Sequence, residues 1–265
     1  QANTTAALTS GVVTATLSDT AANLANLTET NNAYAVTVSD VGTVSAANLL
    51  KIDAASTGSV NASAIGGISG TATEVAAVYA AAAAGTITGL GDEAVTLTGN
   101  TTVTQANNIE ALTTGIVTAT ISNGDMASLN TLEGTGNAYT ITVSDASAKA
   151  GELNALDGKT TVNVNVAAVT SLSGTQAEVT TALAAASLTG WPGAVNVSLT
   201  DNVTLAQADA IAKNGKIGAG VVTATVVDTV ANLKTNTAEA GNAYTIQISD
   251  ASLAAVDLTA IDANT

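Results

Sequence analysis

The sequence predicts an α/β solenoid, a parallel β-sheet of about ten stacked strand–helix coils that follow a right-handed path. Three observations lead to this prediction: a long internal repeat, short strands that are each followed by a helical patch, and an apolar composition with few aromatic residues. Hydrophobic residues make up 46% of the chain and aromatic residues only 2%. Large aromatic side chains usually dominate a globular core, whereas the thin layers between stacked coils can be filled by alanine, valine, leucine and isoleucine.

The repeat is clearest in a hexapeptide that begins with glycine. Gly11-Val-Val-Thr-Ala-Thr returns 104 residues later as Gly115-Ile-Val-Thr-Ala-Thr, and again 105 residues after that as Gly220-Val-Val-Thr-Ala-Thr. Self-similarity at a fixed period is typical of repeat architectures. We therefore predict a single continuous solenoid over residues 1–265, made of about two and a half modules: 1–114, 115–219 and 220–265.

Ten strands are expected within these modules. Apolar and polar residues alternate along them, as in the Val-Thr-Ala-Thr-Leu-Ser stretch at 13–18, and this period of two indicates a sheet with one buried and one solvent-exposed face. Because strands and helices alternate in the sequence, we expect parallel strands with right-handed crossovers in one long sheet. The expected strand starts are Val12, Ala35, Val60, Ala94, Ile116, Tyr139, Val162, Ala194, Val221 and Tyr244.

Helical patches are expected between the strands, because apolar residues recur there at a spacing of three. Two longer helices should open with a capping box, in which Thr accepts from an early amide and Glu reaches back to the start of the helix. They are expected at 73–84 after Thr71-x-x-Glu74 and at 176–186 after Thr175-x-x-Glu178. Glycines at the helix-to-strand returns are expected to provide positive-φ stops; they are Gly58, Gly85, Gly115, Gly158, Gly190 and Gly220.

The two ends of the sequence fall at different points of the module. Gln1 is in phase with Gln105, and Thr265 is in phase with Thr57 and Thr160. Neither end has the pattern of the polar cap that an isolated solenoid needs. We expect either an excerpt of a longer array or ends that stack on neighbouring subunits. The expected partner is therefore the protein itself, as an end-to-end homopolymer or within a longer parent chain.

Charge and composition disfavour several classes of partner. The chain has 21 acidic residues and 6 basic ones, all lysine, for a net charge of −15. No nucleic-acid partner is expected, because phosphate neutralisation needs a basic patch. No run approaches the roughly 18 apolar residues of a membrane-spanning helix, so no membrane insertion is expected. The lack of cysteine excludes disulfides, and an acidic surface without thiols fits an extracellular or cell-surface location.

Aspartates at strand ends form a series that has two interpretations. Successive carboxylates could form a calcium ladder, because hard cations take several carboxylate and carbonyl oxygens. The same residues could instead cap the following helix or close an Asx turn. We favour caps, because Asn123 and Asn100 hold comparable positions and the GGxGxDx calcium signature is absent. No metal-binding residue is assigned, and calcium stays the alternative. The series is Asp19, Asp40, Asp145, Asp201, Asp228 and Asp250.

The sequence offers little material for catalysis. It has no histidine, cysteine or arginine, so only carboxylates, lysine, tyrosine and hydroxyls remain for acid–base or nucleophilic work. Tyr34, Tyr139 and Tyr244 share one repeat phase, which indicates packing, since an active site would not be copied three times. We expect no enzyme, and we assign no catalytic and no cofactor-binding residue.

Paired threonines at strand spacing give the solvent face of the predicted sheet a regular pattern. Such pairs on a flat stacked sheet resemble the ice-binding face of solenoid antifreeze proteins, although other strands carry Asn, Ser or Gln there and Thr is also a good exposed strand residue. Ice binding is therefore a further alternative function. The pairs are Thr14/Thr16, Thr96/Thr98, Thr118/Thr120, Thr140/Thr142 and Thr223/Thr225.

Three phrases carry a family resemblance: TLSDTAANLANL at 16–27, TVSDVGTVSAANLLKIDA at 37–54 and SGTATEVAAVYA at 69–80. They resemble repeats of very large secreted or cell-surface bacterial proteins, cyanobacterial ones especially, and also segments of phage tail-fibre-like proteins. The resemblance implies a surface, matrix or adhesive role and carries over no functional residues. We expect a structural segment of an extracellular fibre, sheath or surface layer. The alternative is an adhesin stalk or tail-fibre shaft, with surface glycans as candidate ligands.

Overall fold

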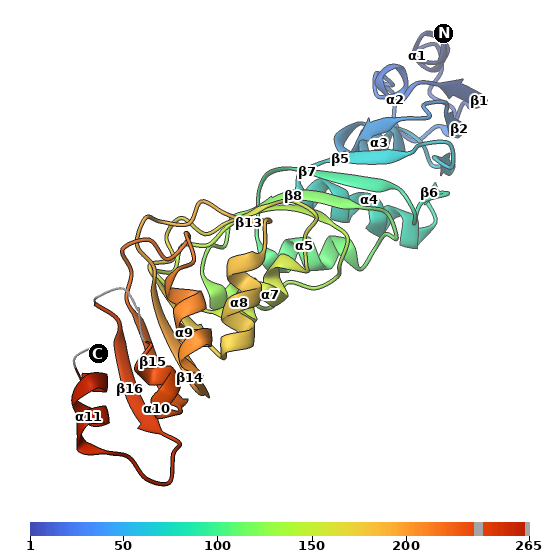
Figure 1. Ribbon diagram of the computed structural model, residues 1–265. Coiled ribbons are helices and arrows are strands. Elements are labelled where there is room, and N and C mark those ends of the chain that lie inside the picture. Colours follow the sequence, from blue (N-terminus) through green and yellow to red (C-terminus); the bar gives the residue numbers. More distant parts are fainter. Residues whose placement is uncertain (236–240, 263–265) are drawn as a thin grey trace. The chain divides into compact units, whose positions relative to one another are not determined.

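The computed structural model describes residues 1–235 and 241–262 (Figure 1). It confirms an α/β protein in which short helices alternate with strands and all strand neighbours within the sheets are parallel. The prediction of one long sheet is wrong, because the strands form three sheets of four, five and seven strands. Thr265, whose repeat phase was noted above, lies outside the described residues.

The chain divides into two compact units, which we describe separately. The first consists of residues 1–123 and 132–140, and the second of residues 124–131 and 141–265. No helix in the described ranges is long and apolar enough to cross a bilayer.

The first unit holds one complete sheet and most of another. The complete sheet has the order β1 (Thr14–Asp19), β2 (Ala33–Val38), β4 (Val60–Asn61), β6 (Ile87–Thr88). The other starts with β3 (Thr43–Ser45), β5 (Gly67–Gly70), β7 (Ala94–Thr101), β8 (Val117–Ile121) and β9 (Ala138–Thr142). The helices are α1 (Ala2–Ala6), α2 (Ala21–Leu24), α3 (Ala46–Ala55), α4 (Ala72–Ala84) and α5 (Val103–Glu110).

The second unit repeats this plan. The end of β9 pairs with β11 (Val164–Asn165), which pairs with β13 (Leu188–Thr189). The third sheet has the order β10 (Ser147–Lys149), β12 (Ser171–Gly174), β14 (Asn196–Val203), β15 (Val222–Asp228), β16 (Ala243–Ile248). The helices are α6 (Met126–Leu129), α7 (Ala150–Asp157), α8 (Gln176–Ala184), α9 (Leu205–Ala212), α10 (Val230–Leu233) and α11 (Ala255–Asp262).

Short strands that the sequence did not predict account for the number of sheets. All ten expected strand starts lie within two residues of an observed start, but β3, β5, β6, β10, β12 and β13 were missed. After β2, which pairs with β4, the chain forms β3, which pairs with β5 and so begins a new sheet. The pair β9 and β10 does the same in the second unit. Neighbouring sheets therefore overlap over several strand–helix units.

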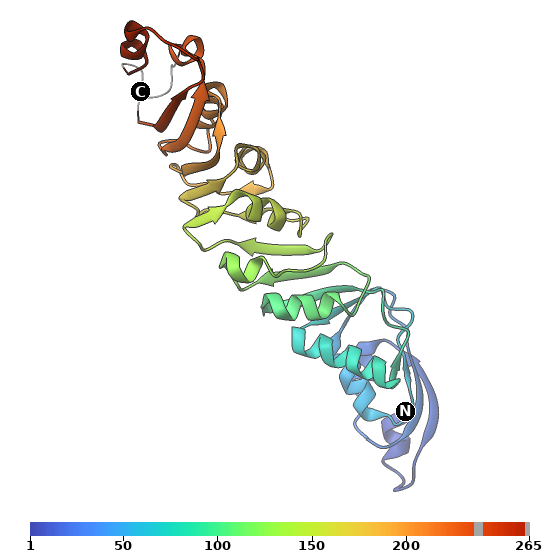
Figure 2. The same cartoon turned by 90° about the horizontal axis from the view of Figure 1, so that it is seen from below.

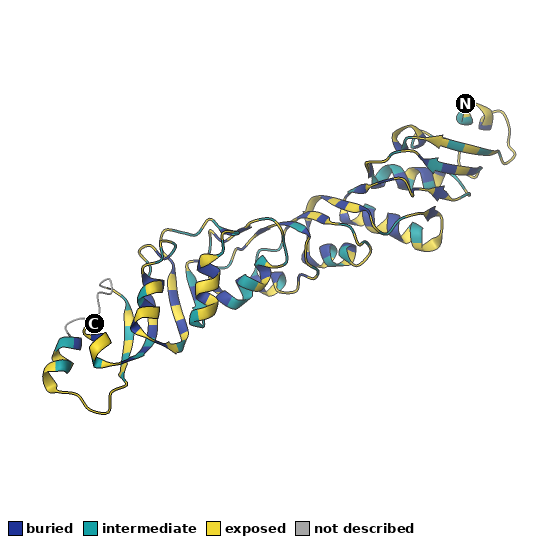
Figure 3. Ribbon diagram, turned by 45° about the vertical axis from the view of Figure 1, so that its right-hand side comes forward, coloured by how far each residue is buried: buried dark blue, intermediate teal, exposed yellow. Residues whose placement is uncertain are grey.

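The core lies between each sheet and the helices that cover it. Buried and exposed residues alternate along the strands (Figure 3); in β2, Tyr34, Val36 and Val38 are buried and Ala35 between them is exposed. Several helices bury apolar side chains at the predicted spacing, as α3 does with Leu49 and Ile52, and helices pack on neighbouring strands, as α5 does on β8 and α9 on β15 (Figure 2). The core is built mainly from alanine, valine, leucine and isoleucine, as the composition predicted, together with a few tyrosines such as Tyr34 and Tyr139.

Candidate functional site

The strand-end acids form the most regular polar feature of the structure, and they connect successive strand–helix units. The carboxylate of Asp40, at the end of β2, accepts a hydrogen bond from the amide of Ala21, the first residue of α2 in the preceding unit, at 2.6 Å. The first amides of a helix have no partner within it, and negative charge is favourable at this end. Four further acids and one asparagine repeat the contact: Asp145 to Met126, Asp201 to Gln176, Asp228 to Leu205, Asp250 to Val230 and Asn123 to Val103.

This arrangement corrects the predicted direction of capping. The acids were expected to serve the helix that follows them, and Asp19 does so locally, through Thr20 N and Asn23 Nδ2. The others reach back 19 to 25 residues along the chain, which parallel stacking makes close in space. Asn100 lies within β7 opposite Thr120 and not at a helix start.

Six helices receive an N-cap from threonine, and α6 receives one from Asp125. The predicted capping boxes at Thr71/Glu74 and Thr175/Glu178 are confirmed. Two more were missed because glutamine takes the place of glutamate; they are Thr102/Gln105 and Thr204/Gln207. In α5, α8 and α9, threonine therefore satisfies the third amide while an acid or asparagine from the next unit satisfies the first.

Asp228 shows the full set of contacts. Its Oδ1 accepts from Thr229 N at 2.8 Å and Asn232 Nδ2 at 2.6 Å, and its Oδ2 accepts from Leu205 N at 3.0 Å. Burial raises the pKa of this carboxyl, but the three donors, Asn232 first, outweigh it and leave the pKa below its ordinary value. A carboxylate held in this way acts as a structural acceptor.

The strand-end acids act as helix caps in this structure. Within the described ranges, no three His, Cys, Asp or Glu residues are grouped so that they could hold one ion. The strand-end acids serve different helices, and each already accepts an amide, so the observed chemistry is that of caps.

The three tyrosines of one repeat phase lie where packing predicts. Tyr34 and Tyr139 are fully buried on β2 and β9, and Tyr244 is half-buried on β16. Burial, followed by the charge of Glu110, raises the pKa of Tyr139 to about 12. Burial and the charge of Asp209 do the same for Tyr244.

One buried polar pair was missed by the sequence analysis. The hydroxyl of Tyr79 on α4 donates to Glu93 Oε2 at 3.1 Å, and Gly91 N donates to Glu93 Oε1 at 2.9 Å. Glu93 is only 2% exposed. Burial first, and then the charge of Glu93, help to raise the pKa of Tyr79 to about 12.

The second module identifies this pair as a packing variant. Leu183 of α8 is equivalent to Tyr79 of α4, and Val195 before β14 is equivalent to Glu93 before β7; both are buried. An apolar pair has thus replaced a hydrogen-bonded one at the same place. Comparison of the modules residue by residue would have revealed the pair, but it indicates a core contact and not a reaction centre.

The threonine face is exposed but irregular. Thr96 lies opposite Thr118, and Thr120 opposite Thr140, on neighbouring strands, with all four side chains exposed. The rows are interrupted elsewhere by alanine: Thr14 faces Ala33, Thr16 faces Ala35 and Thr118 faces Ala138.

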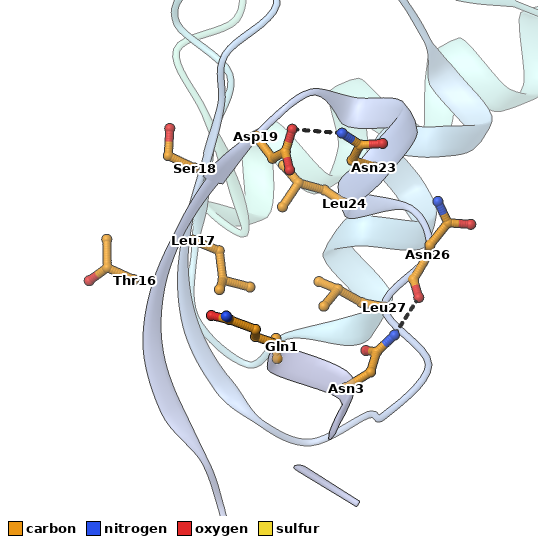
Figure 4. Close-up of a pocket in the computed structure, with 11 residues that line it drawn as sticks. Gln1, Asn3, Thr16, Leu17, Ser18, Asp19, Asn23, Leu24, Asn26 and Leu27 are labelled. Atoms are coloured by element: carbon orange, nitrogen blue, oxygen red, sulfur yellow. Dashed lines mark hydrogen bonds between the residues drawn. The ribbon is translucent and has the colours of Figure 1, made fainter. Parts of the chain in front are cut away.

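A pocket of about 430 Å³ lies in the first unit between α1, β1 and the helix α2 (Figure 4). Gln1, Leu17, Asp19, Leu24 and Leu27 line it together with several polar residues. It combines one carboxylate with leucine side chains and is open to solvent.

Comparisons with known proteins give no relative from which a role could be transferred. No protein-family model matches the chain, and no curated protein or solved structure matches it either.

Proposed function

We propose that this chain is a non-enzymatic structural repeat protein that forms, or belongs to, an extracellular fibre, sheath or surface layer. In this proposal its strand–helix units are about ten coils of one right-handed solenoid, and the mechanism is mechanical. Coils are joined by parallel strand pairing, by apolar packing and by side-chain caps, and assembly extends the stack end to end.

The observation that carries the proposal is the set of caps from one unit to the preceding one. Five acids and one asparagine at or near strand ends accept the first amide of a helix in the preceding unit. Polar groups that a binding or catalytic protein would direct at a ligand are thus directed at the neighbouring repeat. Such nearest-neighbour stability is the property on which solenoid assemblies depend.

Surface chemistry supports a location outside the cell. A net charge of −15 without cysteine or arginine favours solubility and disfavours binding to anionic polymers. Three of the six lysines pair with nearby acids, as Lys149 does with Glu152 at 2.9 Å.

Electron microscopy of the purified protein over a range of concentrations tests the proposal. Long filaments or sheets that grow with concentration would support assembly by stacking. A discrete particle of unchanging size would favour the second candidate, an adhesin stalk or tail-fibre shaft whose glycan-recognising part lies elsewhere. Thermal hysteresis in the same samples would favour ice binding, the function to which the exposed threonine pairs Thr96–Thr118 and Thr120–Thr140 point.

A further inference from the structure

Strand β1 is less buried than two strands with the same repeat sequence. The inward residues of β8 and β15 are buried, whereas those of β1 are only half-buried. β8 pairs with β7 and β15 pairs with β14, but β1 has β2 as its one strand partner in the described part of the chain. The equivalent inward positions are Val13, Ala15 and Leu17 in β1 and Val222, Ala224 and Val226 in β15.

Asp19, at the end of β1, lacks a contact that both of its repeat equivalents make. Asn123 and Asp228 each accept the first amide of the preceding helix, and Asp228 uses Oδ2 for it. Asp19 makes the same two Oδ1 contacts as Asp228, to Thr20 N at 2.7 Å and Asn23 Nδ2 at 2.8 Å (Figure 4). Among the residues that the structure describes, none donates to its Oδ2.

The helix that borders the pocket begins later in the repeat than its equivalent does. Ala2, the first residue of α1, is equivalent in the repeat to Ala106, yet α5 begins three residues earlier, at Val103. In α5 the side chain of Gln105 accepts from Thr102 N and Oγ1 at 2.9 and 3.1 Å. Its equivalent, Gln1, lines the pocket beside Asp19 (Figure 4).

We infer that the edge of β1 and the pocket beside Asp19 form a docking surface for a strand that runs into a first helical turn. The occupant has the sequence pattern of residues 94–104 and 196–206, in which a strand of alternating polarity ends in Thr followed by an aliphatic residue. Its strand covers Val13, Ala15 and Leu17, and its first helical amide binds Asp19 Oδ2. This inference rests on the proposed function in the form in which the chain belongs to a longer array of such units, and it names the chemistry that one face of the stack recognises.

A second copy of the chain fits this surface less well. Six helices begin with amides that acids or asparagine of the same chain already accept, namely α2, α5, α6, α8, α9 and α10. A second copy would have to give up an internal cap to supply any of these amides, and two chains of charge −15 repel each other.

The test joins the sequence of residues 94–104 directly to Gln1, because these residues precede Gln105, the repeat equivalent of Gln1. We expect hydrogen exchange of the β1 amides to slow by about fivefold or more, the factor that one restored helix cap gives, and the melting temperature to rise. Asp19→Ala should remove much of the gain that the extension gives. The original chain also loses the two Oδ1 contacts in this variant, so the gain is taken as the difference between the extended and the original protein, each carrying Asp19→Ala.

A matched control carries the same extension with one residue deleted from its strand, which turns every strand side chain to the opposite face. Equal protection by this control, or no protection by either extension, would overturn the inference. So would concentration-dependent association of the original chain that Asp19→Ala abolishes, because it would assign the surface to a second copy. Filament growth is measured separately on the original chain, so failure here is distinguishable from failure of the proposed function.

Discussion

Individual carboxylates connect successive strand–helix units by accepting hydrogen bonds from the amides at helix starts. Asp228 accepts hydrogen bonds from Thr229 N and Asn232 Nδ2 at the start of α10. It also accepts one from Leu205 N, the first amide of α9. The sequence identified the strand-end acids and favoured capping over calcium. It could not identify the donors, because which amide faces which acid depends on the register of strands about 20 residues apart, which only the parallel stack sets.

Replacement of Asp228 tests the value of such a cap. We expect Asp228→Ala to cost about 1–3 kcal/mol of unfolding free energy, because the amide of the buried Leu205 loses its acceptor. Asp228→Asn should cost less, since Asn123 shows that an amide oxygen suffices for this contact. Urea titrations of both variants measure the difference, and equal losses would contradict the proposed role of the cap.

The Tyr79–Glu93 pair permits a double-mutant cycle with an internal reference. Tyr79→Leu and Glu93→Val each leave a polar group buried without one of its partners and should each cost about 1–3 kcal/mol. The double variant recreates the Leu183/Val195 pair of the second module and should cost less than the sum of the two. Additive losses by chemical denaturation would show that the two side chains are not coupled.

At the scale of elements, the length of a strand decided whether it could be predicted from the sequence. Strands of five residues or more showed their alternation, whereas two- to four-residue strands such as β3 and β5 are too short to show a period. Glycine was recognised at the returns but not always for the right reason. Positive φ is confirmed at Gly85 and Gly190, with φ of 80° and 78°, but not at Gly58, Gly115, Gly158 or Gly220.

Close backbone approach explains the glycine that starts each repeat hexapeptide after the first. A Cβ on Gly220 would lie 2.0 Å from the carbonyl oxygen of Val195, and one on Gly115 would lie 2.2 Å from that of Glu93. We expect Gly220→Ala to destabilise the fold by about 1–3 kcal/mol, because the two strand–helix units must move apart.

Gly42→Ala is the matched control, because a Cβ there meets nothing within 4 Å and its φ is not positive. This variant should be neutral or slightly stabilising. Thermal melts of the two variants side by side test the steric explanation, which fails if Gly220→Ala is tolerated as well as Gly42→Ala.

For the whole molecule, the alternation of strand and helix patterns predicted an α/β protein with parallel strands, but the number of sheets depends on short strands that show no recognisable pattern in the sequence. Because of its ionisable groups, the protein should lose folding stability at both low and high pH. Carboxyls such as Glu74, Asp125 and Asp228 have pKa values lowered by the donors that they accept from, while the pKa values of Tyr79, Tyr139 and Tyr244 are raised.

The sign of each shift fixes the expected profile. Stability contributed by the carboxyls should be complete above their ordinary pKa values of 3.8 and 4.5 and decline as pH falls through the lowered ones. For Tyr79, Tyr139 and Tyr244, whose pKa is about 12, stability should decline as pH rises above the ordinary value of 10.0. Urea midpoints measured across pH test both, and Asp228→Asn should flatten the acid limb.

The overlap of the sheets has a mechanical consequence. Where two sheets run together, neighbouring layers are held by two ladders, as by β2–β4 with β3–β5 and by β11–β13 with β12–β14. Elsewhere a single ladder holds them, and in β7–β8 and β14–β15 that ladder contains a register shift. Under tension, the layers joined by a single ladder should separate first. We therefore expect the molecule to unfold in discrete steps, in which short groups of layers joined by two ladders detach while they remain folded.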